Sequence, residues 1–380
     1  MSASELRLFS PITLRGLRLA NRIVVAPMSQ HSAETDGTAG DFHVMHLGQF
    51  AVSGAGMVIS ESVWVSPEGL NTPRCLGLFS DAHERALARV VGFCAAFAKA
   101  AIGIQLGHAG RKGSVQVPWG GGEPLRPDAG GWQTVAPSAI PIADGGPVPV
   151  ALDLAGLDRI EASFVQAIER AARAGFALAE IHAAHGYLLH QFLSPVTNRR
   201  DDEWGGTREG RMRFPLAVIA AARNAWPDDR PLGVRVSATD WIEGGWDLDD
   251  TIAFVHELAR LGCDYVHVSS GGIAPSQSIA AGPGYQVPFA ARVKAATGMP
   301  TVAVGEITEP HQADTVVRTG QADMVAVARA MLFDPRWGWR AADALGADVD
   351  YPPQYRRANP ALRGIRGLAE PGKPPPALKR

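Results

Sequence analysis

Short runs of apolar residues alternate with longer amphipathic stretches along most of the chain. Most of the short runs are continuously apolar, which is typical of parallel strands that are covered on both faces. The longer stretches place apolar residues at helical spacing, as in Asp249–Leu261, which starts in an acidic turn and ends at Gly262. Eight strands are predicted, at Ile23–Ala26, Met57–Ser60, Ile102–Leu106, Leu178–His182, Leu232–Val236, Tyr265–Val268, Thr301–Val304 and Met324–Val327.

Eight strand–helix repeats predict an α/β fold with one (β/α)8 barrel, the TIM barrel, in a single domain. A doubly wound open sheet is the alternative. It is disfavoured because no Gly-x-Gly-x-x-Gly motif follows the first strand, which runs into Pro27-Met28-Ser29-Gln30 instead. Residues Thr13–Arg22 are expected to form a small hairpin that could plug the N-terminal end of the barrel.

Two segments do not fit the repeat. Residues 111–152, after the third strand, are rich in Gly and Pro, and we expect them to form a long excursion that caps the catalytic side of the barrel. Residues 360–380 are basic, rich in Pro and Gly and poor in apolar residues, so this tail is expected to be disordered. The barrel domain is therefore predicted to span residues 1–359.

The composition narrows the range of functions. A net charge of −2 over 380 residues gives no electrostatic reason to expect nucleic acid or an acidic membrane as a partner. The three cysteines, Cys75, Cys94 and Cys263, are too widely spaced for a zinc ribbon or an iron–sulfur cluster, and they suit a reducing compartment. Without a signal-peptide core or an apolar run of membrane length, a cytoplasmic protein is expected.

The run from Ile181 to Tyr187 carries the most chemistry for its length. It places His182, His185 and Tyr187 at the end of the fourth predicted strand. A phenol can give a proton, and two imidazoles can hold an oxygen that is gaining charge. Two hydrogen-bonded core histidines beside a buried tyrosine are the structural alternative. A zinc pair is disfavoured, because no helix places both rings on one face and no further ligand lies close in the sequence.

In a barrel of this type the working residues lie at the carboxyl ends of the strands. At the last two strands, Gly305 would let backbone approach a phosphate closely and Arg329 would offer a fork of donors, unless Arg329 forms a surface ion pair with Asp334. With Gln105 and Arg235 across the rim, these residues suit a phosphorylated flat heterocycle. Flavin mononucleotide (FMN) fits better than a dinucleotide, because no second phosphate cradle is visible.

Several motifs together resemble the Old Yellow Enzyme family of FMN-dependent ene-reductases. The resemblance runs from about Leu8 to Arg357, and its details are similar to the bacterial, thermophilic-like branch. It implies an oxidoreductase that uses FMN, with NADPH or NADH as reductant, to reduce carbon–carbon double bonds next to an electron-withdrawing group. The motifs are Pro27-Met28-Ser29-Gln30, the segment Gln105–Lys112, the segment His182–Asn198, Gly205-Gly206 and Pro283-Gly284-Tyr285-Gln286.

The resemblance also implies a role for each matching residue. Hydride would pass from flavin N5 to the β-carbon of the activated alkene. His182 and His185 would donate to its carbonyl, and Tyr187 would protonate the carbon α to it. Lys112 matches a family lysine to which no step is assigned. The residues implied to hold FMN are Pro27, Met28, Ser29, Ser62, Gln105, Arg235, Gly305, Ala328 and Arg329.

Three positions depart from the branch. Ser29 replaces a usual cysteine at the flavin N5/O4 edge, which implies an altered flavin potential and no thiol-based redox sensing there. His31 replaces a substrate-facing tyrosine, and the alternative for it is a solvent-facing loop residue. Ala328 replaces a glycine at the phosphate, where a methyl group is tolerated if the backbone φ is below zero.

The C-terminal segment Gln354-Tyr355-Arg356-Arg357 resembles one in which an arginine reaches a neighbouring subunit's active site. Arg357 matches that arginine, which implies a homodimer or a homotetramer, unless the segment is a solvated basic end. Other functions stay open: a quinone, nitro-compound or xenobiotic reductase, a CoA-thioester enoyl reductase, or a flavin-binding module without turnover. Longer relatives that reduce dienoyl-CoA or demethylate amines carry a cysteine cluster after the barrel, which this chain lacks.

Overall fold

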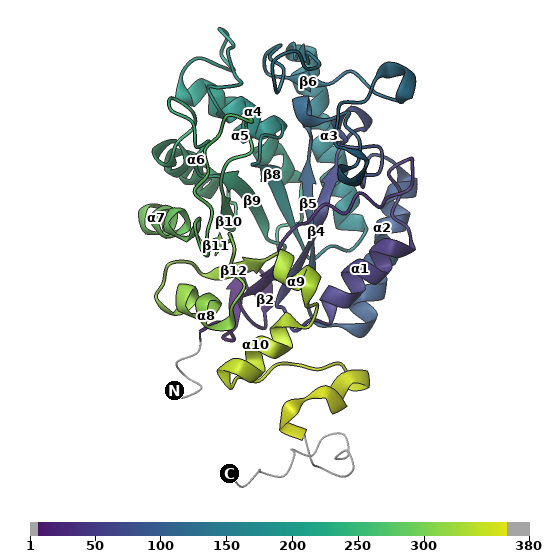
Figure 1. Cartoon of the computed structure of the whole chain (residues 1–380), viewed down its shortest axis with the longest axis vertical. Helices are drawn as coiled ribbons and strands as arrows, with labels where there is room; N and C mark the ends of the chain where they lie inside the picture. The colour runs from purple at the N-terminus through teal and green to yellow at the C-terminus, as the bar shows by residue number, and fades with distance from the viewer. Residues whose placement is uncertain (1–6, 363–380) are drawn as a thin grey trace.

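Eight parallel strands close into a barrel surrounded by helices in the computed structural model, which describes residues 7–362 (Figure 1). Each strand pairs with its neighbours in chain order, and β12 pairs with β3 to close the barrel. The predicted (β/α)8 barrel is confirmed. The strands are β3 (Ile23–Val25), β4 (Met57–Trp64), β5 (Ala101–Gly107), β8 (Leu178–Ala183), β9 (Leu232–Ser237), β10 (Tyr265–Ser269), β11 (Thr301–Ala303) and β12 (Met324–Val327).

The strand that differs most from its predicted bounds is β4. It continues past Ser60 to Trp64, and an irregularity between Ile59 and Ser62 shifts its register against β5. The shift places Ser62 opposite Gln105, at the end of the barrel where parallel strands carry their functional side chains.

The helices follow the strands and cover the outside of the barrel. At the start of α6, the Asp247 side chain accepts a hydrogen bond from the backbone N–H of Asp250 (2.9 Å), and Gly262 follows the last turn with φ of +80°. The helix predicted at Asp249–Leu261 is thus confirmed. The helices are α1 (Asp41–Ala51), α2 (Asp81–Phe97), α3 (Leu154–Arg173), α4 (Leu188–Leu193), α5 (Arg208–Ala225), α6 (Leu248–Arg260), α7 (Val287–Thr297), α8 (Pro310–Arg318), α9 (Arg329–Phe333) and α10 (Trp337–Leu345). None of the helices within residues 7–362 is long and apolar enough to cross a membrane.

The inside of the barrel changes from apolar to polar along the strands. Near the amino ends, one buried cluster includes Leu178 and Tyr265 together with Leu14 and Leu19. The last two come from the antiparallel hairpin of β1 (Ile12–Leu14) and β2 (Leu17–Leu19), so the predicted hairpin is confirmed and it closes this end. Side chains two residues apart on a strand share a face. Beyond the apolar layer, the same faces therefore carry polar side chains, namely Gln105, Glu180, His182, Arg235, Ser237, His267 and Ser269.

The excursion after β5 lies over the carboxyl ends of the strands, at the top of Figure 1. It contains three short 3-10 turns and a two-stranded parallel sheet of β6 (Val135–Ala136) and β7 (Val150–Ala151). The buried Arg111 guanidinium holds it in place by donating to the carbonyl oxygens of Ile140 (3.2 Å), Pro141 (2.9 Å) and Ile273 (2.7 Å). One side chain therefore ties the excursion to the loop after β10.

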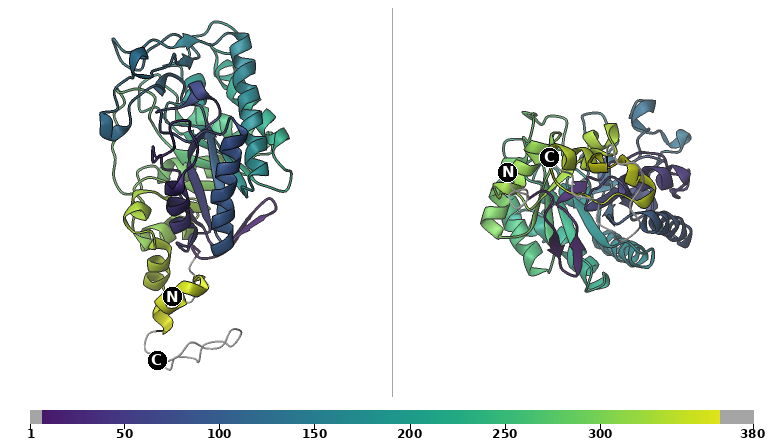
Figure 2. Two further views of the ribbon diagram at one scale, coloured as in Figure 1. Left: turned by 90° about the vertical axis from the view of Figure 1, so that its right-hand side faces the viewer. Right: turned by 90° about the horizontal axis from the view of Figure 1, so that it is seen from below.

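Residues 346–362, which follow α10, lie at the opposite end of the molecule, as Figures 1 and 2 both show. It forms 3-10 turns at Pro353–Ala358 and Pro360–Leu362. The predicted disordered tail begins in the second of these turns. Its remainder, residues 363–380, lies outside the described residues.

Candidate active site

A chain of hydrogen bonds crosses the polar end of the barrel from strand to strand. The Ser62 hydroxyl donates to Gln105 Oε1 (2.6 Å), and Gln105 Nε2 donates to Glu180 Oε1 (2.7 Å). The other Glu180 oxygen accepts from His267 Nδ1 (3.1 Å). Strand register explains the pattern, because Ser62 pairs with Gln105 and Gln105 pairs with Glu180. The fold thus brings together residues that are far apart in sequence.

Arg235 brings a buried positive charge to this end of the barrel. Its register partners are His182 on β8 and His267 on β10, and it is only 8% exposed. Within residues 7–362 its guanidinium makes no hydrogen bond or ion pair, and its Nε is buried without a partner. Burial lowers the pKa of Arg235, whereas the Glu180 carboxylate opposes that change. A buried cation without a direct partner is costly, so this position suits an electron-rich acceptor such as the pyrimidine edge of a flavin. The residues present therefore fit FMN.

The two histidines form a directional pair. His182 Nδ1 accepts from the backbone N–H of Ala184 (3.2 Å), so the ring proton lies on Nε2, which faces His185 Nδ1 (3.3 Å). His185 Nε2 then donates to the Ser269 hydroxyl (2.7 Å). Burial, followed by the charge of Arg235, holds the pKa of both rings well below the usual value. Both imidazoles are therefore neutral at physiological pH and can donate without carrying charge.

Tyr187 completes the cluster. It immediately precedes α4 as its N-cap residue, and its ring packs edge to face against His182 and Trp64, with centroids 4.9 Å apart in each pair. Lys112 Nζ lies 5.1 Å from the centre of the same ring. Burial raises the pKa of the Tyr187 phenol above its usual value, so the hydroxyl keeps its proton. The structure thus brings the three predicted catalytic side chains into one cluster.

Lys112 also shapes the backbone beside the histidines. Its ammonium donates to the carbonyl oxygens of His185 (2.8 Å) and Gly272 (3.2 Å). His185 has a left-handed backbone, with φ of +57°, which a non-glycine residue rarely adopts. Burial, together with the charge of Arg111, lowers the pKa of Lys112 to about 8. Lys112, to which the sequence assigns no catalytic step, therefore stabilises the turn that carries His185.

The segment after β3 supplies Pro27, Met28 and Ser29, and the Ser29 side chain is exposed. His31 is only 9% exposed, so the alternative of a solvent-facing residue is wrong. Its Nδ1 lies 3.1 Å from Thr72 Oγ1, and its ring meets that of Trp119, in the excursion, at 6.1 Å. His31 therefore links the β3 loop to the cap.

The expected phosphate region lies where β11 and β12 end. Gly305 has φ of +118°, a conformation that favours glycine, and a Cβ there would lie 2.8 Å from Gln286 Nε2, so the Gln286 side chain would have to shift. Ala328 precedes α9 with φ of −109°, which meets the condition set for its methyl group. The Arg329 side chain is 79% exposed and pairs with Glu306 (3.3 Å). The alternative of a pair with Asp334 is wrong, because Asp334 pairs with Arg340 (2.8 Å).

The sequence analysis gave no role to several residues of the site. They are Glu180, Ser237, His267, Ser269 and Gln286, and each hydrogen-bonds to a predicted residue or to a residue that supports one. Glu180 did carry a signal. It is a charged residue inside an otherwise apolar run, two positions before His182 and hence on the same face of the strand.

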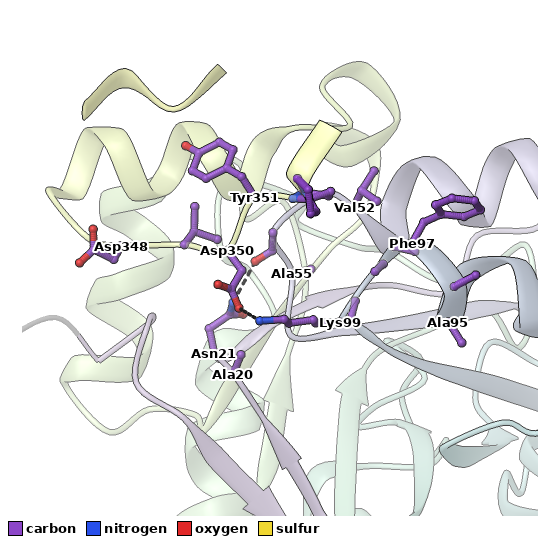
Figure 3. Close-up of a pocket in the computed structure, with 18 of the residues that line it drawn as sticks. Ala20, Asn21, Val52, Ala55, Ala95, Phe97, Lys99, Asp348, Asp350 and Tyr351 are labelled. Atoms are coloured by element: carbon purple, nitrogen blue, oxygen red, sulfur yellow. Dashed lines mark hydrogen bonds and ion pairs between the residues drawn. The ribbon is translucent and has the colours of Figure 1, made fainter. Parts of the chain in front are cut away.

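Arg357 lies at the other end of the barrel from this cluster. Its side chain is exposed on the 3-10 turn Pro353–Ala358. The preceding segment borders a cavity of about 480 Å³, where Lys99 pairs with Asp350 (3.0 Å) (Figure 3). The cavity lies beside the amino ends of β3, β4 and β5, so it is remote from the histidines.

Comparison with known proteins shows which family the chain matches. Residues 7–347 match the NADH:flavin oxidoreductase / NADH oxidase family. The chain is 42% identical over 351 residues to an NADPH dehydrogenase of Geobacillus thermodenitrificans (strain NG80-2), covering 92% of this chain and 98% of the relative. Its fold is similar to that of morphinone reductase, with a TM-score of 0.73 and 30% identity over 92% of each chain. It is also similar to an old yellow enzyme homologue from Zymomonas mobilis, with a TM-score of 0.74 and 26% identity over 90% of this chain and 94% of the other.

Proposed function

Because the chain belongs to the NADH:flavin oxidoreductase / NADH oxidase family, we propose that it reduces the carbon–carbon double bond of activated alkenes, such as α,β-unsaturated carbonyl compounds. It is an FMN-dependent oxidoreductase of the NADPH dehydrogenase type, with NADPH or NADH as reductant. The proposal adds the class of substrate and the residues that act on it.

The observation that carries the proposal is the cluster of His182, His185 and Tyr187 beside the buried Arg235. Bound FMN would supply the redox chemistry between the nicotinamide and the β-carbon of the alkene. Negative charge then develops on the carbonyl oxygen, where neutral imidazole N–H groups stabilise it by about 3 kcal/mol each. Tyr187, which burial keeps protonated, gives its proton to the α-carbon.

Binding of the carbonyl by both rings requires one rearrangement. His185 Nε2 donates to Ser269, and His182 Nε2 faces His185 Nδ1. Each ring must therefore exchange a protein acceptor for the substrate oxygen. Hydrogen bonds of catalytic groups commonly tighten in this way only when the substrate binds. Ser269 does not lose its role as a donor, because its hydroxyl also lies 3.3 Å from Gln286 Oε1.

The FMN would lie across the polar end of the barrel. Gln105 and Arg235 offer an amide and a cation for its pyrimidine edge, and Gly305 permits close approach of backbone to its phosphate. The Arg329 side chain is exposed, so it could exchange its ion pair with Glu306 for a contact with that phosphate. The full set proposed to hold FMN is Pro27, Met28, Ser29, Ser62, Gln105, Arg235, Gly305, Ala328 and Arg329.

Anaerobic stopped-flow absorbance tests the proposal. The purified protein should be yellow, lose its flavin absorbance on mixing with NADPH or NADH, and regain it on mixing with a cyclic enone, a maleimide or a nitroalkene. A protein that is reduced by nicotinamide but reoxidised by none of these acceptors would refute the proposed substrate class. Reoxidation by quinones alone would favour the quinone-reductase alternative.

Changing Ser29 to cysteine is expected to shift the midpoint potential of the flavin. The hydroxyl of Ser29 is exposed and makes no hydrogen bond within residues 7–362, so it is free to contact a ligand. A thiol is a weaker hydrogen-bonding group and can be oxidised. Redox titration should show the shift, and peroxide should then inactivate Ser29→Cys but not the parent or Ser29→Ala. An unchanged potential in Ser29→Cys would contradict the proposed contact.

We also propose that Arg357 acts in the active site of a neighbouring subunit of a homodimer or homotetramer. Its exposure, at the end of the molecule remote from its own histidines, supports this. Arg357→Ala should lower kcat/KM by about 10- to 100-fold, the usual effect of losing a hydrogen bond from a charged group. Arg356→Ala is the matched control, and deletion of the residues after Asn359 should be harmless. Equal activity of Arg357→Ala and Arg356→Ala would count against a role of Arg357 in the neighbouring active site.

A further inference from the structure

Glu180 is a fully buried carboxylate whose two oxygens are both occupied. It is 0% exposed, and it accepts from Gln105 Nε2 through one oxygen and from His267 Nδ1 through the other. Burial alone would favour the neutral acid, but His267, Arg235 and Gln105 together hold the pKa of Glu180 below its usual value. The side chain is therefore an anion at the polar end of the barrel.

The carboxylate determines which way the Gln105 amide faces. An ionised carboxylate can only accept hydrogen bonds, so the amide nitrogen of Gln105 must point at Glu180. The Ser62 hydroxyl, 2.6 Å from Gln105 Oε1, then donates to the amide oxygen. Both contacts require the same orientation of the amide. The second N–H and the second lone pair of Gln105 are left for a ligand at fixed positions.

Glu180 lies on the strand next to that of Arg235, two residues before His182, which is the register partner of Arg235, so both side chains are on the same face of the barrel. Of the charges around Arg235, that of Glu180 does most to raise the pKa of Arg235. Arg235 has no direct partner within the described residues, so this longer-range attraction is the main compensation for its buried charge. Removing the Glu180 charge would leave Arg235 uncompensated. Because reduced FMN carries more negative charge than oxidised FMN, the reduced form would then bind more tightly.

We propose that Glu180 is a positioning residue for FMN, which fixes the orientation of the Gln105 amide and offsets the charge of Arg235. The inference rests on the proposed FMN site. Glu180 would act on the flavin through Gln105 and Arg235, the two groups proposed to contact it.

The test is the midpoint potential of Glu180→Gln, which removes the charge and keeps the shape. We expect reduced FMN to gain about tenfold over oxidised FMN, as the loss of one charge inside a protein allows. That gain corresponds to a positive shift of about 30 mV for a two-electron couple. The control is Glu169→Gln, which makes the same change of net charge on the exposed side of α3 and should leave the potential unchanged.

A second variant separates charge from position. Glu180→Asp keeps the charge but shortens the side chain, so the contact with Gln105 is lost. It should leave the potential near that of the parent while weakening FMN retention in ultrafiltration several-fold. If Glu180→Gln does not fold, this variant decides alone, and undiminished FMN retention in it overturns the proposal. If Glu180→Gln folds with the parent's potential, the proposal is wrong.

The two proposals fail in different ways. A parent protein that is colourless and does not take up FMN refutes the flavin site itself. A yellow parent whose potential matches that of Glu180→Gln refutes only the role of Glu180.

Discussion

Tyr187→Phe is expected to slow reoxidation of the reduced enzyme by a cyclic enone by about 10²- to 10⁴-fold, the range that general acids contribute. Reduction by NADPH should be unaffected, because hydride uptake needs no proton from this hydroxyl. The phenylalanine keeps the ring packing against His182 and Trp64, which lie with centroids 4.9 Å away, so the change removes the proton donor alone. Stopped-flow absorbance measures the two half-reactions separately.

A matched control for this variant is Tyr351→Phe, which removes a tyrosyl hydroxyl in the C-terminal segment remote from the site. It should leave both half-reactions at the parent's rates. Slowing of both half-reactions by Tyr187→Phe would point to a disturbed flavin site rather than to a lost proton. Equal rates of enone reduction in the two variants would rule out Tyr187 as the acid.

Asp240→Ala is expected to lower the free energy of unfolding by about 2–5 kcal/mol, because it leaves the buried Ser194 hydroxyl and the Trp246 N–H without an acceptor and removes the carboxylate beside His190. Asp240 lies 2.9 Å from His190 Nε2, and both side chains are 0% exposed. It also accepts from the Ser194 hydroxyl (2.6 Å) and the backbone N–H of Trp246 (2.7 Å). The other nitrogen of His190 accepts from Gly186 N–H (2.8 Å), so this network supports the turn between His185 and Tyr187.

Chemical denaturation monitored by tryptophan fluorescence measures the loss. The control is Asp158→Ala on the exposed face of α3, which should change stability by no more than about 0.5 kcal/mol. A loss below about 1 kcal/mol in Asp240→Ala would show that the network does not stabilise the fold.

The same residue makes stability depend on pH. Burial opposes ionisation of Asp240, but His190 and the hydrogen bonds from Ser194 and Trp246 prevail and hold its pKa below the usual value. The folded-state pKa is depressed, so the contribution is fully present above the unfolded value of about 3.9 and is lost as the pH falls through the folded value. Below about pH 4, the parent should therefore lose stability more steeply than Asp240→Asn.

The barrel and the main catalytic cluster could be predicted because each depends on local patterns. Continuous apolar runs mark the strands, and the close spacing of His182, His185 and Tyr187 places them at one strand end. The contacts that orient these residues could not be predicted, because they come from neighbouring strands. Ser269 meets His185 across 84 positions of sequence, and only the register of the barrel brings them together.

Two alternatives that the sequence left open are wrong for a similar reason. The exposure of His31 and the partner of Arg329 depend on side-chain packing rather than on sequence spacing. Asp334 is near Arg329 in the chain, but it lies past the short helix α9 and pairs with Arg340 instead. Glu306 is distant in sequence and reaches Arg329 because β11 and β12 are adjacent.

The change from hydrocarbon to polar side chains along the barrel axis separates two tasks of one fold. A substitution at a residue such as Leu178 alters how firmly the scaffold is assembled and leaves the reacting groups untouched. Two residues farther along the same strand, at Glu180, a substitution alters electrostatics at the mouth. Robustness and redox character can therefore vary independently during evolution, by changes only about 7 Å apart along a strand.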